Sequence, residues 1–364
     1  MKVLLIGAGR YGNGLVGRKY REKEFGAELG YVVDPKIDEI KTREDYRLGS
    51  TPTYRNLEEI PKESFDKNLV AEIALIPNHI VDVYARLINL GAKKVILPKP
   101  VAQDFDSFEK IKEISDKNNV QTAVASNWHY SKITEFLRAI LDKTKGEEVS
   151  DSDILDEYKH KLKTVKEGFE IEKVEIEYNK KEEVLTIDPP SQELPHALQI
   201  AYSCGLTDFE NSNFIVDKDK QTESRVHVKV ETPHVKDGIE INSDLNMGER
   251  LNKRRERIVR IYLNDDDPEA DIVADYDAQF DQHGNCLKKP KISYKITKGD
   301  EQTIWSEEIT EDNMNTMYEK IFSYFRGENK GIKEALTLEK YEPISRAICT
   351  IQELWAKCTR GEKE

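Results

Sequence analysis

The feature that most constrains the fold of this chain is a glycine-rich turn near its start. The apolar residues Val3 to Ile6 lead directly into the run Gly7-Ala8-Gly9-Arg10-Tyr11-Gly12, and a segment with helical spacing follows at once. In a GxGxxG turn the first glycine permits the tight turn, the second lets the backbone approach a diphosphate, and the third lets helix and strand pack closely. The run therefore predicts a strand, turn and helix of the dinucleotide-binding type.

An acidic residue stands where such a turn needs one. Asp34 ends the next expected strand, 22 residues after Gly12. A carboxylate at this position can accept hydrogen bonds from the hydroxyls of an adenine ribose, and it would repel an additional 2′-phosphate. The expected cofactor is therefore NAD, with NADP possible because Lys36 lies nearby.

Short apolar runs alternate with longer amphipathic runs over residues 1–126, a pattern typical of a parallel sheet covered on both faces. Gly91 stands where a helix needs a left-handed cap, and Asp104 or Asp106 can cap the next helix. We predict a doubly wound Rossmann domain. Its expected strands are Lys2–Ile6, Leu29–Val33, Val70–Ile76, Lys94–Leu97 and Gln121–Ala125, and its expected helices are Asn13–Phe25, Ile80–Leu90 and Asp106–Asn118.

Residues 127–364 have a different pattern, which predicts an α+β domain with an open, mainly antiparallel mixed sheet. A charged segment at 143–168 is expected to be an insertion with an exposed amphipathic helix, and the last helix is a candidate to pack back on the first domain. The expected strands are Glu170–Tyr178, Val184–Ile187, Arg225–Glu231, Ile258–Tyr262, Ile272–Tyr276, Ile292–Thr297 and Thr303–Glu307. The expected helices are Ile133–Leu141, Leu194–Ser203, Asn313–Phe325 and Leu338–Ala356.

Composition excludes several functional classes. A net charge of −13 over 364 residues disfavours binding to nucleic acid, because most of the surface would repel a phosphate backbone. No apolar run approaches the length of a membrane span or a signal peptide, so we expect a cytoplasmic protein without a membrane partner. The four cysteines form no CxxC pair, and no metal site is indicated.

A second motif connects the glycine turn to a known family. Together with the turn, the run Leu97-Pro98-Lys99-Pro100-Val101-Ala102 resembles the glucose-fructose oxidoreductase, inositol dehydrogenase and rhizopine-catabolism (Gfo/Idh/MocA) oxidoreductase family. The resemblance extends over most of the chain. It implies that Ala123–Leu141 crosses between the two domains and that Gln192–Gly205 forms a helix facing the substrate.

The resemblance also implies an NAD(P)-dependent dehydrogenase or reductase with two catalytic residues, Lys99 and His196. An imidazole suits the removal of a hydroxyl proton near neutral pH, and an ammonium group would stabilise the developing alkoxide. The expected cofactor-binding residues are Gly7, Gly9, Arg10, Tyr11, Gly12, Asp34, Pro77, Asn78, Lys99 and Pro100. The expected substrate-binding residues are Lys99, Trp128, His129, Tyr130, Gln192, Glu193, His196 and Gln199.

Three departures from the family pattern leave alternatives open. Pro98 replaces the usual glutamate before Lys99, and Gln192 and Gln199 replace two frequent acids around the histidine. A glutamine can hydrogen-bond a substrate but cannot act as a base. The leading hypothesis is oxidation or reduction of a small polyol, sugar or sugar derivative. The alternatives are a reductase of an imine or carbonyl natural-product intermediate and a non-catalytic NAD(P)-binding sensor. The family also implies a homo-oligomer, a dimer or tetramer.

Overall fold

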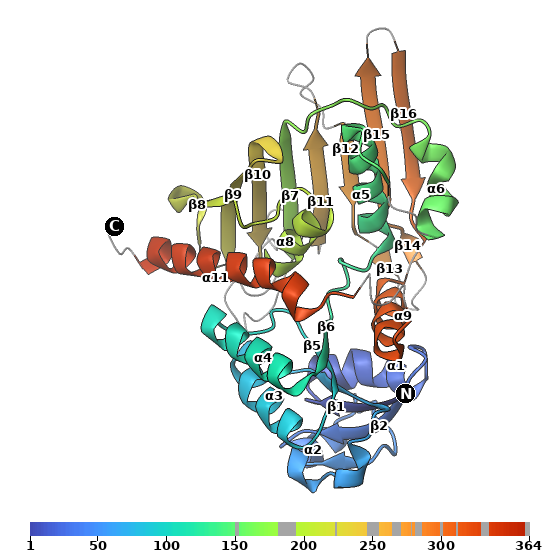
Figure 1. Cartoon of the computed structure of the whole chain (residues 1–364), viewed down its shortest axis with the longest axis vertical. Coiled ribbons are helices and arrows are strands. Elements are labelled where there is room, and N and C mark those ends of the chain that lie inside the picture. Colours follow the sequence, from blue (N-terminus) through green and yellow to red (C-terminus); the bar gives the residue numbers. More distant parts are fainter. Residues whose placement is uncertain are drawn as a thin grey trace. The chain divides into compact units, whose positions relative to one another are not determined.

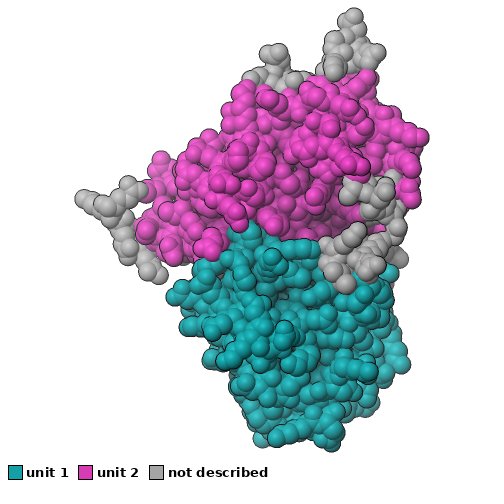
Figure 2. All heavy atoms as spheres, viewed as in Figure 1, with its two compact units in different colours: residues 1–127, 314–345 teal, residues 128–313, 346–364 magenta. Residues whose placement is uncertain are grey.

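The computed structural model describes residues 1–149, 153–180, 194–222, 224–245, 255–263, 271–277, 279–280, 286–298, 301–310, 312–328 and 335–360 (Figure 1). The chain forms two compact units (Figure 2). Unit 1 comprises Met1–Asn127 and Met314–Ser345, and unit 2 comprises Trp128–Asn313 and Arg346–Glu364.

The described strands of unit 1 form a parallel sheet in the order β3-β2-β1-β4-β5-β6. This order is that of a doubly wound Rossmann sheet, as the sequence predicted. The alternating pattern missed only the short β3. The strands are β1 (Lys2–Ile6), β2 (Glu28–Val33), β3 (Thr53–Tyr54), β4 (Leu69–Ile73), β5 (Lys94–Leu97) and β6 (Gln121–Val124).

Helices connect these strands. The first opens with a π-helical segment, η1 (Arg10–Val16), and continues as α1 (Gly17–Arg21). It begins and ends earlier than the expected range of 13–25. The others are α2 (Ile37–Lys41), α3 (Ile80–Asn89) and α4 (Phe105–Asn118), with α3 and α4 side by side (Figure 1), and short 3₁₀ turns η2 (Leu57–Glu59), η3 (Lys62–Ser64) and η4 (Pro77–His79).

Two predicted helix caps are confirmed. Gly91 adopts a positive φ of 105° after α3, which glycine does without the strain of a side chain. The Oδ1 of Asp104 accepts a hydrogen bond of 2.7 Å from the backbone N–H of Ser107 at the start of α4. The caps fix where α3 ends and α4 begins.

A helix from the last part of the sequence completes unit 1. The ring of Tyr318, in α9 (Asn313–Arg326), stacks on Phe25 with centroids 4.0 Å apart. The sequence assigned residues 127–364 to the second domain, with the last helix as a candidate to pack back on the first; residues 314–345, which include the start of that helix, lie in unit 1. Their buried aromatic side chains pack against α1, a contact that local sequence patterns do not reveal.

Unit 2 contains a mixed sheet in the order β16-β15-β12-β11-β7-β10-β9-β8, in which the described pairs are antiparallel except β10 with β7. This confirms the predicted sheet class. Strands β8 and β10 were not predicted, and the expected strand 184–187 lies outside the described residues. The strands are β7 (Lys173–Lys180), β8 (Asn213–Val216), β9 (Arg225–Thr232), β10 (Val235–Asp244), β11 (Arg255–Tyr262), β12 (Ile272–Asp275), β15 (Lys291–Lys298) and β16 (Glu301–Glu308), with β13 (Gln279–Phe280) and β14 (Cys286–Lys288) pairing separately.

The helices of unit 2 are α5 (Lys132–Lys145), α6 (Asp153–Leu162), α8 (Leu194–Ser203) and most of α11 (Leu338–Arg360), with a 3₁₀ turn η5 (Lys218–Lys220). The insertion helix α6 is more buried than predicted. Its Tyr158 is buried and stacks on Phe136 of α5 with centroids 4.5 Å apart. Among the described residues no helix has the length and apolarity that crossing a membrane requires.

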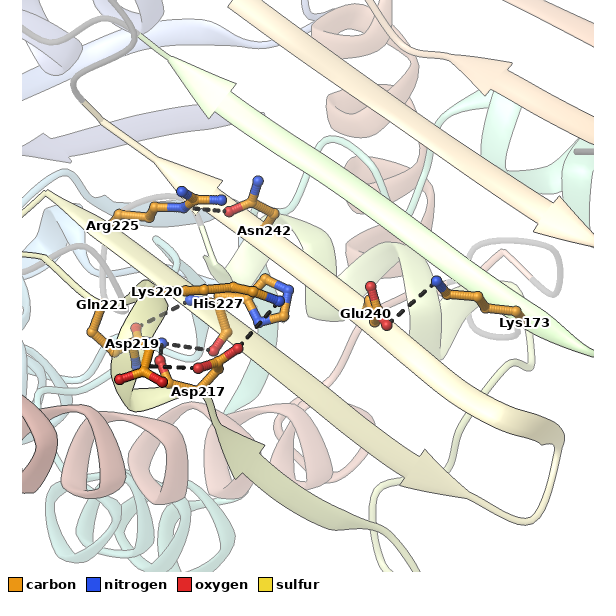
Figure 3. A network of polar contacts seen from close by, with 9 residues as sticks. All are labelled: Lys173, Asp217, Asp219, Lys220, Gln221, Arg225, His227, Glu240 and Asn242. Carbon is orange, nitrogen blue, oxygen red and sulfur yellow. Dashed lines mark hydrogen bonds and ion pairs between the residues drawn. The ribbon is translucent and has the colours of Figure 1, made fainter. Parts of the chain in front are cut away.

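The sheet of unit 2 has one apolar and one polar face. Along β7, Val174, Ile176 and Tyr178 are buried, and the residues between them are only partly buried. Figure 3 shows polar side chains of β7, β9 and β10 and of the segment around η5: Lys173 pairs with Glu240 at 3.3 Å, and Arg225 donates to Asn242 at 2.9 Å. These ion pairs and hydrogen bonds satisfy charged groups across neighbouring strands.

Candidate active site

The glycine turn has the geometry that only glycine permits at two positions. Gly7 has a φ of +98°, and a Cβ built on it would lie 2.5 Å from the carbonyl oxygen of Ala74. A Cβ on Gly12 would lie 2.0 Å from the carbonyl oxygen of Gly7. At Gly9 an added Cβ would meet no protein atom within 4 Å. The turn therefore has no room for a side chain at Gly7 or Gly12 but leaves space beside Gly9, which fits the approach of a diphosphate group.

The helix after the turn starts with wider hydrogen bonding than an ordinary α-helix. The backbone N–H of Gly17 donates to the carbonyl of Gly12, five residues back, whereas that of Asn13 makes an ordinary α-helical bond to the carbonyl of Gly9 at 2.8 Å. The N-terminal end of such a helix is favourable for an anion. The backbone of Arg10 lies in this turn, whereas its side chain is outside the described atoms.

Asp34 ties the turn to the end of β2. Its Oδ2 accepts a hydrogen bond of 2.8 Å from the backbone N–H of Ala8, and its Oδ1 accepts one of 2.8 Å from that of Lys36. Each carboxylate oxygen can accept a further hydrogen bond. Gly7, Gly12 and Asp34 thus form one connected arrangement, and it fits a ribose beside a diphosphate.

The other expected cofactor residues follow neighbouring strands. Pro77 and Asn78 lie in η4, just after β4, and Lys99 and Pro100 follow β5. Pro100 is buried, Lys99 is half-buried, and the peptide bond between them is cis. The carboxyl ends of parallel strands share one edge of a sheet, where ligands of open α/β folds bind.

In unit 2 the expected base His196 lies in an aromatic cluster. Its half-buried ring comes from α8 and stacks on Tyr178, with centroids 5.0 Å apart and planes at 21°. Trp128 donates a hydrogen bond from Nε1 to the hydroxyl of Tyr178, and the guanidinium of Arg257 lies 4.9 Å from the Tyr178 ring centroid. Stacking on this fixed ring restricts the orientation of the His196 imidazole.

A second polar group joins His129 to α8. The Nδ1 of His129 and the hydroxyl of Ser203 are 2.9 Å apart, and the Nε2 of Gln199 donates to the same hydroxyl at 2.9 Å. Gln199 is fully buried and Tyr130 is 1% exposed, so in this structure these two offer almost no surface to a substrate. Gln192 and Glu193 lie outside the described residues.

Sequence reasoning overlooked several residues that shape these regions. Tyr178 looked like an ordinary strand residue, Arg257 lies just before the expected strand Ile258–Tyr262, and Glu72 looked like part of an apolar strand. The signal for Glu72 was available, since a carboxyl inside the run Leu69–Ile76 needs a hydrogen-bond partner if that run is buried. Among the described residues no cluster of histidine, cysteine or acidic side chains could hold a metal ion.

The parallel sheet, the glycine turn and Asp34 define a dinucleotide-binding domain that is followed by a mixed-sheet domain. Residues 1–126 match the family model for the oxidoreductase family with an NAD-binding Rossmann fold. The first domain of this chain is thus similar to the NAD-binding Rossmann domain of the Gfo/Idh/MocA oxidoreductases. A search of curated protein sequences found no match.

Solved structures share the whole fold at low sequence identity. An oxidoreductase from Agrobacterium radiobacter, solved with NAD⁺, L-tartaric acid and magnesium, has 11% identity and a TM-score of 0.65, covering 98% of this chain and 96% of its own. UDP-N-acetylglucosamine 3-dehydrogenase from Acidithiobacillus ferrooxidans has 12% identity and a TM-score of 0.61, covering 97% of each chain. A 3-ketoreductase from Actinomadura kijaniata, solved with TDP-benzene and NADP, has 9% identity and a TM-score of 0.62, covering 99% and 97%. At these identities the similarity establishes the fold.

Proposed function

We propose that the protein transfers a hydride between NAD and a small polyol, sugar or sugar derivative. The observation that carries the proposal is the glycine turn. Its backbone is closely packed at Gly7 and Gly12, and the N–H of Ala8 joins it to Asp34. The family match and the sugar-nucleotide dehydrogenase among the similar structures support it. When bound, the nicotinamide supplies or accepts the hydride.

In the proposed reaction His196 takes the proton of the substrate hydroxyl, and the ammonium of Lys99 stabilises the charge on that oxygen. An imidazole held by Tyr178 is suited to a proton transfer that depends on orientation. Lys99 is a fitting partner because Pro100 restricts its backbone, so that the side chain can be aimed. His129 is the proposed substrate contact from the crossing segment, whereas Trp128 is only 3% exposed and supports the ring of Tyr178 instead.

Two alanine variants test the catalytic roles. Lys99→Ala and His196→Ala should each lower turnover by roughly 10²- to 10⁴-fold, as expected for general acid–base groups, and should keep NADH affinity. The exposed residues Lys93 and His160 provide matched controls, since Lys93→Ala and His160→Ala should keep turnover. Wild-type protein that bound neither NADH nor NADPH in fluorescence titrations would contradict the proposal. Binding without any turnover would favour the cofactor sensor.

Asp34 is the proposed determinant of cofactor choice. Asp34→Asn keeps a side-chain acceptor for Ala8 but removes the charge that repels a 2′-phosphate. Because hydrogen bonds to charged groups contribute more than neutral ones, NADH affinity should fall by roughly tenfold, while NADPH affinity rises. Titration of wild type and variant with both cofactors measures the ratio. An unchanged ratio would show that Asp34 does not select the cofactor.

A second candidate function is the reduction of a carbonyl or imine. The observation that favours it is the buried Gln199, whose amide is engaged with Ser203 and cannot act as a base. Reduction needs a proton donor, which Lys99 or His196 could supply. Assays in both directions against polyols, keto sugars and cyclic imines separate the candidates, because activity only on polyols would exclude this one.

We further propose that the protein is a cytoplasmic homo-oligomer, a dimer or tetramer, that uses the open sheet of unit 2. The ion-paired face containing Lys173 and Glu240 is a suitable surface (Figure 3). Association across such a face should weaken at high salt, because screening reduces interactions between exposed charges. Light scattering after size-exclusion chromatography at low and high salt would measure this, and a monomer under both conditions would exclude it.

A further inference from the structure

Strand β4 buries a carboxyl group in the middle of the parallel sheet. Glu72 is 2% exposed and lies between β1 and β5. Burial without hydrogen bonds would be costly for such a group. Burial raises the pKa of Glu72 to about 7, while two tyrosine hydrogen bonds act in the opposite direction.

The two partners of Glu72 come from distant parts of the chain. The hydroxyl of Tyr20, in α1, donates to Oε2, and the hydroxyl of Tyr318, in α9, donates to Oε1. The hydroxyl of Tyr11 lies 3.3 Å from that of Tyr318. Because Tyr318 gives its hydrogen to Glu72 when the carboxyl is ionised, Tyr11 is then the donor in the last bond. A directed chain therefore runs from Tyr11 through Tyr318 to Glu72.

Tyr11 is part of the glycine turn itself. It stands between Arg10 and Gly12, and the residue is 38% exposed although its hydroxyl reaches Tyr318. Tyr11 therefore joins a partly exposed residue of the turn, where the diphosphate of a dinucleotide is proposed to lie, to a hydroxyl in the interior of unit 1. Tyr318 is itself held by stacking on Phe25 at 4.0 Å and by its edge contact with Tyr20 at 5.5 Å.

We propose that Glu72 and Tyr318 are positioning residues that hold the ring of Tyr11 against the bound dinucleotide. This inference rests on the proposed function, because it assumes a dinucleotide at the glycine turn. A tyrosine fixed at its hydroxyl loses little freedom when a ligand contacts its ring, so binding is favoured by preorganisation. Without the anchor, Tyr11 would have to be ordered by the ligand.

Deleting one oxygen atom, the hydroxyl of Tyr318, removes the connection between Tyr11 and Glu72. In the full-length protein, Tyr318→Phe keeps the aromatic packing but deletes the hydroxyl that joins Tyr11 to Glu72. The dissociation constant for NADH, measured by fluorescence, should rise roughly three- to tenfold, as for the loss of one hydrogen bond. The affinity for AMP, measured by calorimetry, should fall less, because AMP places only one of the two phosphates at the turn. Tyr324→Phe, the same change elsewhere on α9, is the matched control and should leave both affinities unchanged.

A double-mutant cycle separates positioning from a general loss of structure. Tyr11→Phe should weaken NADH binding as Tyr318→Phe does, and combining the two should add nothing, because both break the same connection. At Glu72, Glu72→Leu should weaken NADH binding, while the isosteric Glu72→Gln should restore most of it by keeping an acceptor. A general structural effect would lower NADH and AMP affinity together and would add in the double variant.

The outcomes distinguish this inference from the proposed function. Wild-type protein that binds no NADH or NADPH overturns both. Wild-type binding with an unchanged NADH affinity in Tyr318→Phe overturns the inference alone. Equal losses for NADH and AMP also overturn it, since they place the role of Tyr318 in the fold rather than at the turn. A selective, non-additive loss of NADH affinity supports it.

Discussion

Glu72 lies in surroundings that differ strongly from those of an ordinary glutamate, because its carboxyl is buried. Exposed glutamates are ionised well below neutral pH, whereas burial raises the pKa of Glu72 from 4.5 to about 7. The folded protein therefore holds the proton of this carboxyl over a pH range in which the unfolded chain has released it. Such a difference in proton binding makes folding stability depend on pH.

The sign of that dependence follows from the raised pKa. The contribution of Glu72 to the free energy of unfolding is greatest below pH 4.5 and declines as the pH rises to 7, by about 3 kcal/mol at 1.36 kcal/mol per pKa unit. Glu72→Gln has no proton to lose and should remove this decline. Urea unfolding at pH 5 and pH 8 measures it. The exposed control Glu63→Gln should retain the decline. An equal change in the free energy of unfolding between pH 5 and pH 8 in wild type and Glu72→Gln would contradict the prediction.

The same residue shows where sequence reasoning reaches its limit. Gly7, Gly12 and Asp34 could be predicted because their constraints are local: a turn, a close approach and a strand end. The role of Glu72 could not, because its partner Tyr318 lies 246 residues away. The oddity of a buried acid is visible in the sequence, but the identity of the group that satisfies it is a property of the fold.

At the scale of elements, the helix after the glycine turn depends on a further glycine, Gly17, that the motif does not include. A Cβ on Gly17 would lie 2.3 Å from Cδ2 of Leu48 and 2.5 Å from the carbonyl oxygen of Gly12. The side chain of Asn13 also holds the segment before Leu48, accepting from Arg47 N–H and donating to the Asp45 carbonyl, each at 2.9 Å. The π-helical start is thus packed closely against a loop.

Alanine substitutions at two glycines of this helix should have different effects on the free energy of unfolding. Gly17→Ala should lower the free energy of unfolding by roughly 1–3 kcal/mol, the usual cost of overpacking, because one clash is with backbone. At Gly14 an added Cβ meets nothing within 4 Å, so Gly14→Ala should be neutral or slightly stabilising. Thermal and urea unfolding of both variants provide the measurement. Equal destabilisation by Gly17→Ala and Gly14→Ala would mean that the close packing at Gly17 is not the reason for the loss of stability.

Strand β10 shows why an element can be missed. It lies next to β7 in the centre of unit 2, yet its sequence contains Gly238 and several polar residues that indicate a turn. Gly238 has a φ of +82°, and a Cβ there would lie 2.8 Å from the carbonyl oxygen of Val230. The glycine permits an irregular register with β9. The apolar pattern predicted most strands of this sheet, whereas β10 was recognisable only from its neighbours.

For the whole molecule, the important feature is that unit 1 is built from two separate parts of the chain. Tyr318 and Phe322 of α9 pack against Tyr20, with ring centroids 5.5 and 6.2 Å apart, and Tyr318 also satisfies Glu72. A Rossmann domain cut from the sequence at its predicted boundary would lack this cover. Its sheet would be complete, but a buried acid and several aromatic rings would be exposed.

A fragment of residues 1–127 should therefore be less stable than the same unit in the full chain. We expect a lower melting temperature and increased binding of a dye that recognises exposed apolar surface, because Phe25 and Tyr20 lose their partners. Joining residues 313–345 to the fragment through a flexible linker should restore both values toward those of the full chain. A fragment as stable alone as with α9 would show that the helix contributes little to unit 1.

The split construction of unit 1 has a consequence for how the protein is made. Synthesis proceeds from the amino end, and domains usually fold as they emerge. Here the glycine turn and all the described strands of the parallel sheet leave the ribosome long before α9, which ends at Arg326. The domain that is translated first should be among the last to finish, and until then its open side is a natural target for chaperones.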